Sequence, residues 1–300
     1  MNNELYELLD FGEGRRLERF GKTIFDRPAP NVGDTAKSSP EKWAEADVRY
    51  ERDADTRGPG EARGQWTSKD TLPDSWPFEM NGFHLRLRPT SSGQLGIFPE
   101  QIENWAWIQS QVRSILDEVP TPGETAAPAR IRVLNLFAHT GGSTLAAAHA
   151  GAEVVHVDAA RNSVGWAKRN AECSGLAKAP IRWIVEDATL FAKREAKRGN
   201  RYEGLILDPP SYGHGAAGQP WALQKHLLPL LRNCGELIKE TGRFVLLTCH
   251  TPGLGPAELL EMVADTLFCG NQVEAIAQPV SITSSSGGEL PIGTVLRWRS

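Results

Sequence analysis

Short apolar runs alternate with longer amphipathic segments over residues 131–268. The apolar runs predict strands, over residues 131–137, 153–158, 181–186, 204–208 and 244–249. The amphipathic segments predict helices, over residues 143–150, 163–174, 188–198, part of 219–240, and 257–268. Strands that alternate with helices form βαβ units. The pattern therefore predicts an α/β domain whose parallel sheet is covered by helices on both faces.

The segments on either side of this pattern have a different character. Apolar positions three or four residues apart predict a helix over residues 101–119, and a Pro/Ala-rich linker follows as far as residue 130. Beyond the last helix, residues 272–282 and 294–299 have strand patterns joined by a stretch rich in Ser, Gly and Pro, which predicts a terminal hairpin. Five parallel strands and this hairpin give a mixed seven-stranded sheet.

Residues 1–94 lack the regular alternation of strands and helices. Residues 31–64 are polar and rich in Gly, Pro, Asp and Arg, which predicts a loop. Residues 83–88 alternate apolar with polar side chains, which predicts a half-buried strand. We therefore expect a small β-rich accessory region with a polar loop over residues 1–94, and a second domain over residues 95–300.

Composition places the chain among ordinary globular proteins. Of its 300 residues, 40% are hydrophobic and 23% are charged, which excludes disorder of the whole chain. No apolar stretch approaches the roughly 18 residues of a membrane span, and no secretory signal is visible at the start. Four widely spaced cysteines form no metal-binding pattern, so we expect reduced thiols, a cytoplasmic location and no metal.

The formal net charge of −4 gives no general case for nucleic-acid binding, so local clusters decide. One basic cluster near the N-terminus is interleaved with aromatic residues. It consists of Arg15, Arg16, Arg19, Lys22 and Arg27, with Phe11, Phe20 and Phe25. Such a cluster can bind phosphates and stack on bases, but a solvated charged face is the interpretation we prefer. Trp66 and Trp76 are expected to anchor a small β-rich core.

Open α/β sheets bind ligands at the carboxyl ends of their strands, and the first predicted strand ends in a glycine turn. This turn contains Phe137, His139, Thr140, Gly141 and Gly142. Paired glycines allow a ligand to approach the backbone closely, although a plain tight turn explains them as well. The turn does not match GxGxxG, which disfavours a nicotinamide cofactor.

Acidic residues follow the second and third predicted strands. Asp158 is placed to accept hydrogen bonds from both ribose hydroxyls of an adenosine-type ligand. Asp187 can face the exocyclic amine of adenine, with the Ala188 amide available to a ring nitrogen, or it can be the N-cap of the next helix. These acids alone do not distinguish a nicotinamide cofactor from S-adenosylmethionine.

The fourth predicted strand ends in the most specific motif, Asp208-Pro209-Pro210-Ser211-Tyr212. The prolines fix the backbone and leave carbonyl groups without competing local amides. We expect Asp208 to point between the cofactor and the substrate, and the four residues after it to contact the substrate.

Together these motifs resemble the class I S-adenosylmethionine-dependent methyltransferases, which have a Rossmann-like sheet ending in a hairpin. The sequence VLNLFAHTGG, the acids after strands two and three, and the Asp-Pro-Pro motif are most similar to the branch that methylates carbon 5 of cytosine in large-subunit ribosomal RNA. The segment 96–101 also resembles one that packs beside the cofactor in this family. The resemblance covers residues 95–300 and implies S-adenosylmethionine as cofactor and ribosomal RNA as partner. Residues 1–94 do not resemble the RNA-binding module of many relatives.

The fifth predicted strand ends in Thr248-Cys249, where the resemblance implies the nucleophile. Carbon 5 of cytosine becomes nucleophilic only after a thiolate adds to carbon 6. Cys249 would attack, Asp208 would contact the ring nitrogen, and His250 would lower the pKa of the thiol. A small buried structural cysteine is the alternative.

Two further alternatives remain open. Enzymes that methylate base amines carry an aromatic residue directly after Asp/Asn-Pro-Pro, whereas here Ser211 occupies that place and Tyr212 comes one residue later. The same fold can also act on a small molecule or a protein, or bind without catalysis. The sequence leaves the target nucleotide and the oligomeric state open.

Overall fold

A computed structural model describes residues 6–53, 63–118, 130–215, 218–268 and 273–300. The chain forms two compact units. The first comprises Met1–Met80, His84–Glu100 and Val280–Ile292, and the second comprises Asn81–Phe83, Gln101–Pro279 and Gly293–Ser300. The first unit thus includes the tip of the C-terminal hairpin, which the sequence pattern assigned to the domain 95–300.

The second unit is built on the mixed seven-stranded sheet that the sequence predicts. Its parallel strands are β8 (Arg132–Leu136), β9 (Glu153–Asp158), β10 (Ile181–Val185), β11 (Gly204–Leu207) and β14 (Phe244–Cys249). The C-terminal strands are β15 (Ala275–Thr283) and β16 (Glu289–Arg299). The order across the sheet is β10-β9-β8-β11-β14-β16-β15, and β16 runs antiparallel to β14. This arrangement confirms the predicted fold class.

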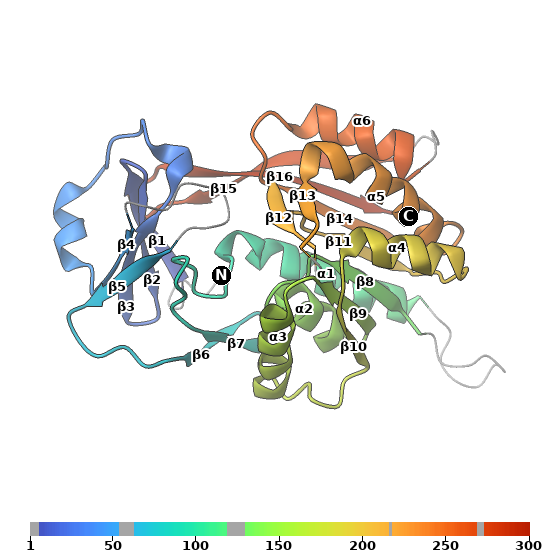
Figure 1. Ribbon diagram of the computed structural model, residues 1–300, viewed down its shortest axis with the longest axis horizontal. Helices are drawn as coiled ribbons and strands as arrows, with labels where there is room; N and C mark the ends of the chain where they lie inside the picture. Colours follow the sequence, from blue (N-terminus) through green and yellow to red (C-terminus); the bar gives the residue numbers. More distant parts are fainter. Residues whose placement is uncertain (1–5, 54–62, 119–129, 216–217, 269–272) are drawn as a thin grey trace. The chain divides into compact units, whose positions relative to one another are not determined.

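Six helices of the second unit form two groups (Figure 1). One group is α1 (Ile102–Asp117), α2 (Gly142–His149) and α3 (Arg161–Cys173), and the other is α4 (Ala188–Lys197), α5 (Leu223–Ile238) and α6 (Pro256–Thr266). Within each group, neighbouring helices contact one another in chain order. The bounds of each helix agree to within about two residues with the segment in which the sequence predicts it.

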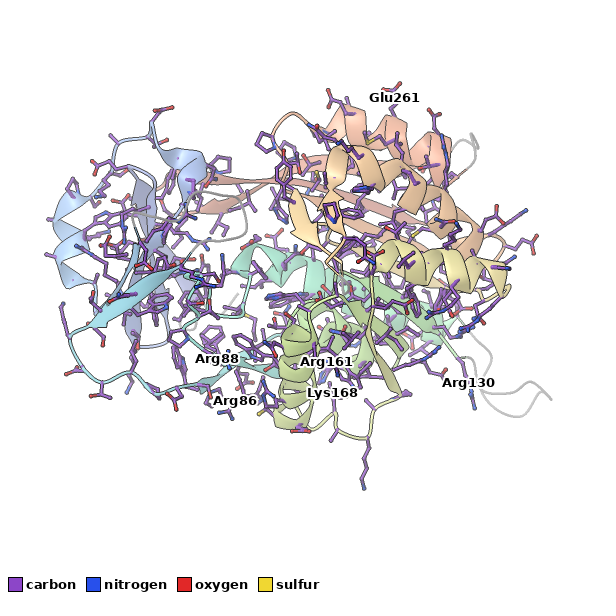
Figure 2. All side chains as sticks on the ribbon, viewed as in Figure 1. Arg86, Arg88, Arg130, Arg161, Lys168 and Glu261 are labelled. Carbon is purple, nitrogen blue, oxygen red and sulfur yellow. The ribbon has the colours of Figure 1, made fainter. Side chains whose placement is uncertain are left out.

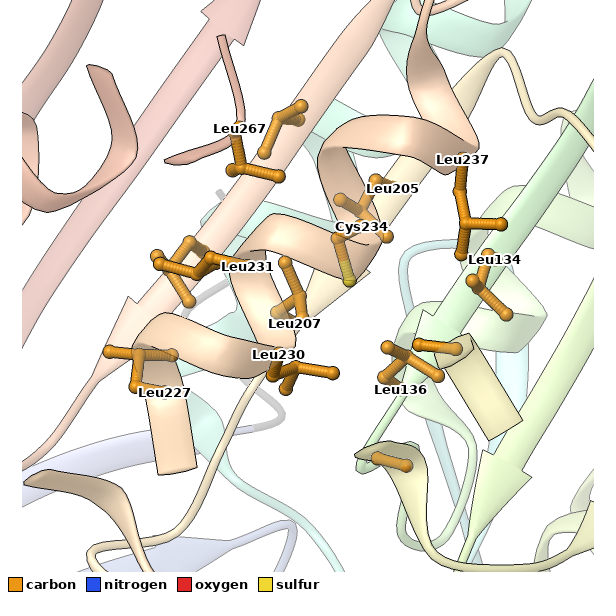
Figure 3. Packing of buried hydrophobic residues seen from close by; sticks show 14 of the residues in the cluster. Leu134, Leu136, Leu205, Leu207, Leu227, Leu230, Leu231, Cys234, Leu237 and Leu267 are labelled. Atoms are coloured by element: carbon orange, nitrogen blue, oxygen red, sulfur yellow. The ribbon is translucent and has the colours of Figure 1, made fainter. Parts of the chain in front are cut away.

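Leucine side chains of α5 cover one face of the sheet (Figure 3). Leu227, Leu230 and Leu231 of α5 belong to the same buried cluster as Leu205 and Leu207 of β11. Each such side chain contributes roughly 1.5–3 kcal/mol by leaving water. Residues at alternate positions of a strand share a face, so odd-numbered residues of β11 and β14 point toward α5. Even-numbered residues point to the opposite face.

Helix α3 shows how the amphipathic segments are oriented. Val164 and Trp166 are buried, whereas Arg161 and Lys168 are exposed and point away from the ribbon (Figure 2). The apolar side of the helix contacts β9 and β10.

The first unit contains a five-stranded sheet in the order β1-β2-β3-β4-β5, and β6 and β7 form a separate pair. The strands are β1 (Tyr6–Gly12), β2 (Arg15–Phe20), β3 (Thr23–Pro28), β4 (Val48–Arg52), β5 (Gly64–Ser68), β6 (Trp76–Met80) and β7 (Phe83–Leu87). Phe25 stacks on Trp76 with ring centroids 6.0 Å apart and contacts Trp66 edge-on at 6.1 Å. Both tryptophans are half-buried and pack against the fully buried Phe25, as expected for anchors of a small β-rich core.

The basic cluster near the N-terminus is largely an internal ion-pair network, so the predicted solvated charged face is wrong for its central residues. Arg27 is 1% exposed, and its Nη2 lies 2.5 Å from Oε2 of the fully buried Glu18. Burial opposes ionisation of Glu18, but Arg16 and Arg27 outweigh it and lower the pKa of this carboxyl. Counting charges along the chain does not reveal these pairs, because they form between β2 and β3.

Two further differences concern short strands. The predicted polar loop contains β4, which pairs with β3 and β5. Directly after the Asp-Pro-Pro motif, β12 (Tyr212–His214) pairs with β13 (Pro220–Ala222), which the sequence pattern did not predict. Strands this short form only because a partner strand is present. The predicted linker after residue 119 and Cys269 lie outside the described residues.

Candidate active site

The carboxyl ends of the five parallel strands bring together most of the residues that the sequence singled out. Residues 137–142 follow β8, Asp158 ends β9, Glu186 and Asp187 follow β10, Asp208 follows β11, and Cys249 ends β14. All of these residues belong to the second unit.

The turn between β8 and α2 has an unusual backbone. Phe137 and His139 have φ angles of 57° and 47°, although neither is glycine. Each left-handed residue of this kind costs about 1–2 kcal/mol, and such strain concentrates at functional sites. The backbone amide of His139 donates a hydrogen bond to Oδ2 of Asp158 across 2.8 Å, which fixes the turn to the end of β9. Thr140 is buried, and its carbonyl accepts from Asn170 Nδ2 at 2.8 Å.

The two glycines of this turn are required by packing within the protein. Gly141 has φ 90°, and a Cβ there would lie 2.9 Å from the Cβ of Ala167 on α3. A Cβ on Gly142 would lie 2.4 Å from the ring of Trp105 on α1. The sequence left a ligand and a plain tight turn open as reasons for these glycines, whereas the structure gives contacts with α1 and α3 as a sufficient reason.

Asp158 presents a carboxylate with remaining acceptor capacity. Its Oδ2 accepts from the His139 amide and its Oδ1 accepts from the Ala160 amide, both at 2.8 Å. A carboxylate has about four lone-pair positions, so each oxygen can accept one further hydrogen bond. This arrangement suits a vicinal diol such as the ribose of an adenosine-type ligand.

Asp187 is the N-cap of α4, which confirms the capping alternative. Its Oδ1 accepts from the Leu190 amide at 2.9 Å. Glu186 forms a two-pronged ion pair with Arg194 at 2.5 and 2.6 Å, while Ala188 is buried at the start of the helix. The second oxygen of Asp187 and the Ala188 amide suit the polar edge of an adenine ring.

Asp208 is the most heavily hydrogen-bonded carboxylate at this edge. Its Oδ1 accepts from the Thr248 hydroxyl and lies 3.1 Å from His250 Nε2, and its Oδ2 accepts from Gln101 Nε2 at 3.2 Å. Burial opposes ionisation, but the contacts from His250 and Thr248 and the charge of His139 hold the pKa of Asp208 below its ordinary value. Asp208 is therefore an ionised acceptor near neutral pH.

Gln101, the last residue of the segment 96–101, belongs to a buried polar chain whose other members, Asn104 and Arg297, the sequence did not place at the site. Arg297 Nη2 donates to Asn104 Oδ1 at 2.6 Å, and Asn104 Nδ2 donates to Gln101 Oε1 at 2.7 Å. Gln101 then donates to Asp208. The available signal was the presence of polar Gln101 and Asn104 on the buried side of a helix, because buried amides require partners.

The loop after Asp208 is tied to neighbouring elements by its backbone and by Ser211. The Pro210 carbonyl accepts from Trp221 Nε1 at 2.7 Å, and the Trp221 ring lies 4.8 Å from that of Phe137. Ser211 Oγ lies 2.7 Å from Thr251 Oγ1. Tyr212 is 61% exposed.

Cys249 lies at the end of β14 and is only 1% exposed. The pKa of its thiol is raised above the ordinary value, because burial and the charge of Asp208 outweigh the lowering effect of the Thr251 amide and hydroxyl, which donate to the sulfur. The prediction that His250 lowers this pKa is wrong, because His250 pairs with Asp208.

The described part of the chain contains no group of three or more His, Cys, Asp or Glu side chains arranged to hold a metal ion. Among the same residues, every helix is too short or too polar to cross a membrane.

The donor set at this edge fits S-adenosylmethionine. The Asp158 carboxylate has acceptors left for two ribose hydroxyls, and Asp187 with Ala188 offers a polar edge for adenine. The strained turn of residues 137–142 follows β8, so in the sheet order Asp158 at the end of β9 lies between this turn and Asp187 after β10.

Comparisons with known proteins agree with this assignment. A family model described as S-adenosylmethionine-dependent methyltransferase matches residues 34–286. The crystal structure of a SAM-dependent methyltransferase from Agrobacterium tumefaciens is 32% identical, with a TM-score of 0.84, and the match covers 98% of this chain and 90% of that one.

Curated relatives match over shorter stretches. Ribosomal RNA large subunit methyltransferase I of Aeromonas hydrophila is 30% identical over 165 residues, which is 54% of this chain and 40% of the relative. Ribosomal RNA large subunit methyltransferase K/L of Pseudoalteromonas atlantica is 33% identical over 115 residues, 38% of this chain and 16% of the relative. The chain thus spans less than half the length of these relatives. The extended family match and the sheet-edge acids together show that this chain belongs to the S-adenosylmethionine-dependent methyltransferases.

Proposed function

We propose that this protein transfers a methyl group from S-adenosylmethionine to a nucleobase of RNA, with ribosomal RNA as the candidate substrate. The matched curated relatives are named as methyltransferases of large-subunit ribosomal RNA. S-adenosylmethionine, when bound, supplies an electrophilic methyl group. In our proposal Asp158 accepts from its ribose, Asp187 and Ala188 bind its adenine, and residues 137–142 line its binding site.

For the acceptor atom we propose carbon 5 of a cytosine. The observation that carries this proposal is the contact between Thr251 and the sulfur of Cys249. The Thr251 hydroxyl can donate only one hydrogen bond. When it donates to the sulfur, Ser211 Oγ must be the donor in the 2.7 Å contact with Thr251. Cys249 is thereby connected to the loop that follows Asp208.

This connection supports the chemistry of a thiolate nucleophile. The two donors of Thr251 stabilise a negative sulfur and partly offset burial, which nevertheless leaves the pKa of the Cys249 thiol raised. The thiolate would add to carbon 6 of the ring, which makes carbon 5 nucleophilic. Pro209, Pro210, Ser211 and Tyr212 would contact the base beside Asp208, which would contact the ring nitrogen.

The test is incubation with RNA that contains 5-fluorocytosine, together with S-adenosylmethionine, followed by denaturing electrophoresis. Fluorine at carbon 5 cannot leave as a proton does, so a methylated covalent complex should accumulate with the intact protein. The complex should be absent with Cys249→Ala and unchanged with Cys173→Ala, in which an exposed cysteine of α3 is replaced. Methyl transfer by Cys249→Ala at the normal rate contradicts the carbon-5 proposal.

Methylation of a base amine is the second candidate, and it is favoured by the exposure of Tyr212 and the burial of Cys249. Tyr212 is 61% exposed and available for stacking, whereas the Cys249 side chain is buried among apolar residues. Under this alternative Cys249→Ala retains activity. Tyr212→Ala then loses about 1–3 kcal/mol of base stacking, and Tyr212→Phe keeps it. The same RNA methylation assay with these three variants distinguishes the two candidates.

A further inference from the structure

The hairpin of β12 and β13 reaches across the carboxyl edge of the sheet. It begins in the loop after β11, and the ring of Trp221 in β13 lies 4.8 Å from that of Phe137, which follows β8. Gly215, directly after β12, packs against Asp187, which follows β10. In the sheet order β10 and β11 are three strands apart, so the hairpin reaches across about 14 Å of this edge. It therefore crosses the strand ends at which our proposal places the cofactor.

The neighbours of Gly215 leave no room for a side chain. A Cβ at this position would lie 2.9 Å from Oδ2 of Asp187 and 2.6 Å from Oε1 of Gln219. The φ angle of Gly215 is not positive, so its backbone conformation alone does not require glycine. The Gly215 amide donates to the Gln219 carbonyl at 2.7 Å, which holds the residue in the hairpin. Glycine is therefore required here by the space that Asp187 and Gln219 occupy.

The Asp187 carboxylate cannot turn away from Gly215 without loss. Its Oδ1 accepts from the Leu190 amide at 2.9 Å as the N-cap of α4, which fixes the orientation of the carboxylate. Within the described part of the chain no donor contacts Oδ2, so this is the oxygen left for a ligand. Gly215 adjoins this same oxygen. A methyl group at position 215 would therefore displace Oδ2 or occupy the space beside it.

We propose that Gly215 determines recognition of the adenine amine, because it keeps Oδ2 of Asp187 in place to accept a hydrogen bond from that amine. This inference rests on the proposed binding of adenine by Asp187 and Ala188. An exocyclic amine donates hydrogen bonds, and a carboxylate oxygen is a strong acceptor for them. A purine that lacks the amine has no donor for this oxygen.

The experiment measures the affinity of the full chain for two ligands by calorimetry. One ligand is S-adenosylhomocysteine, and the other is its analogue in which hydrogen replaces the exocyclic amine of the purine. The variant is Gly215→Ala. The matched control is Gly213→Ala in the same hairpin, where a Cβ would lie 3.5 Å from Pro210, which is an ordinary contact distance.

A second variant separates the two contacts of the new methyl group. Gly215→Ala is also combined with Gln219→Ala, which removes the Gln219 side chain and leaves the contact with Asp187. Gln219→Ala alone is the control for this background. Thermal unfolding checks that each variant is folded before the ligands are compared.

We expect the unaltered protein, Gly213→Ala and Gln219→Ala to bind S-adenosylhomocysteine about 10-fold or more tightly than the analogue. Gly215→Ala, alone or with Gln219→Ala, should bind both ligands with similar and lower affinity. An undiminished preference for S-adenosylhomocysteine in Gly215→Ala overturns the inference, as does a preference restored by Gln219→Ala, which would assign the effect to Gln219. If the unaltered protein binds both ligands equally, the proposed placement of adenine at Asp187 itself fails.

Discussion

The Gln101 side chain donates a hydrogen bond to Asp208 Oδ2 across 3.2 Å, although the two residues are 107 positions apart. Gln101 precedes the first residue of α1 and Asp208 directly follows β11. The contact therefore attaches the start of the domain's first helix to the carboxylate at the centre of the site. Asn104 and Arg297 extend it to the last strand of the chain.

Replacing Gln101 should destabilise the protein because buried polar groups lose their partners. In Gln101→Leu, Asn104 Nδ2 loses its acceptor and Asp208 loses a donor, which costs about 1–3 kcal/mol. The control is Gln111→Leu in α1, whose amide donates to the hydroxyl of the neighbouring Ser110. Urea unfolding measures both variants, and equal losses would contradict a specific role for the Asp208 contact.

Asp158 should account for a large share of cofactor affinity. Asp158→Ala removes a charge-assisted acceptor worth about 1.5–3 kcal/mol and also releases the His139 amide. We expect the affinity for S-adenosylhomocysteine to fall about 10- to 150-fold by calorimetry, with no binding of NADH by any form of the protein. Glu172→Ala, an exposed position on α3, is the control. An unchanged affinity of Asp158→Ala would mean that the ribose lies elsewhere.

Gly141 and Gly175 allow the cost of strain to be separated from the cost of a clash. Both have positive φ, 90° and 72°, but a Cβ at Gly175 meets no atom within 4 Å, whereas one at Gly141 approaches Ala167. Gly175→Ala should lose only about 1 kcal/mol of stability through strain. Gly141→Ala should lose a further 1–3 kcal/mol or so through overpacking. Thermal unfolding of the two variants tests whether Gly141→Ala loses more stability than Gly175→Ala. If adding Ala167→Gly to Gly141→Ala restores stability, the contact between positions 141 and 167 accounts for the additional loss.

His156 should make the protein less stable in acid. It is fully buried, and burial, together with the charges of His139 and Lys168, lowers its pKa to about 3. Because the unfolded chain binds a proton near pH 6.5 and the folded one does not, stability is complete above that pH and falls as the pH drops toward 3. From pH 7.5 to 5.0 the loss from this residue is about 2 kcal/mol.

The measurement for His156 is a comparison of urea unfolding at these two pH values. His156→Phe retains a ring beside Trp183 but does not titrate. Its stability should therefore depend less on pH than that of the unaltered protein, by about 2 kcal/mol over the interval. The same pH dependence in both proteins would show that His156 is protonated in the folded state.

Some features of the structure could be predicted from the sequence and others could not. Strands β9 and β14 have the bounds that their apolar runs predict, and Asp158, Asp208 and Cys249 lie at strand ends as expected. Apolar runs and helix periodicity report local burial, and burial decides these elements. In contrast, Arg27 pairs with Glu18 across two strands, and Asp208 accepts from Gln101, which lies 107 positions earlier. No local pattern encodes such pairs.

The sequence by itself determined the α/β architecture, the alternation of the main strands and helices, and that Asp158, Asp208 and Cys249 come at the carboxyl ends of parallel strands. These features follow from periodicity and from the common direction of parallel strands. Only the tertiary structure decided that Gly141 and Gly142 are required by Ala167 and Trp105, and that His250 pairs with Asp208 rather than with Cys249. Both depend on the direction of individual side chains across packed elements, which is set by contacts among residues far apart in the chain.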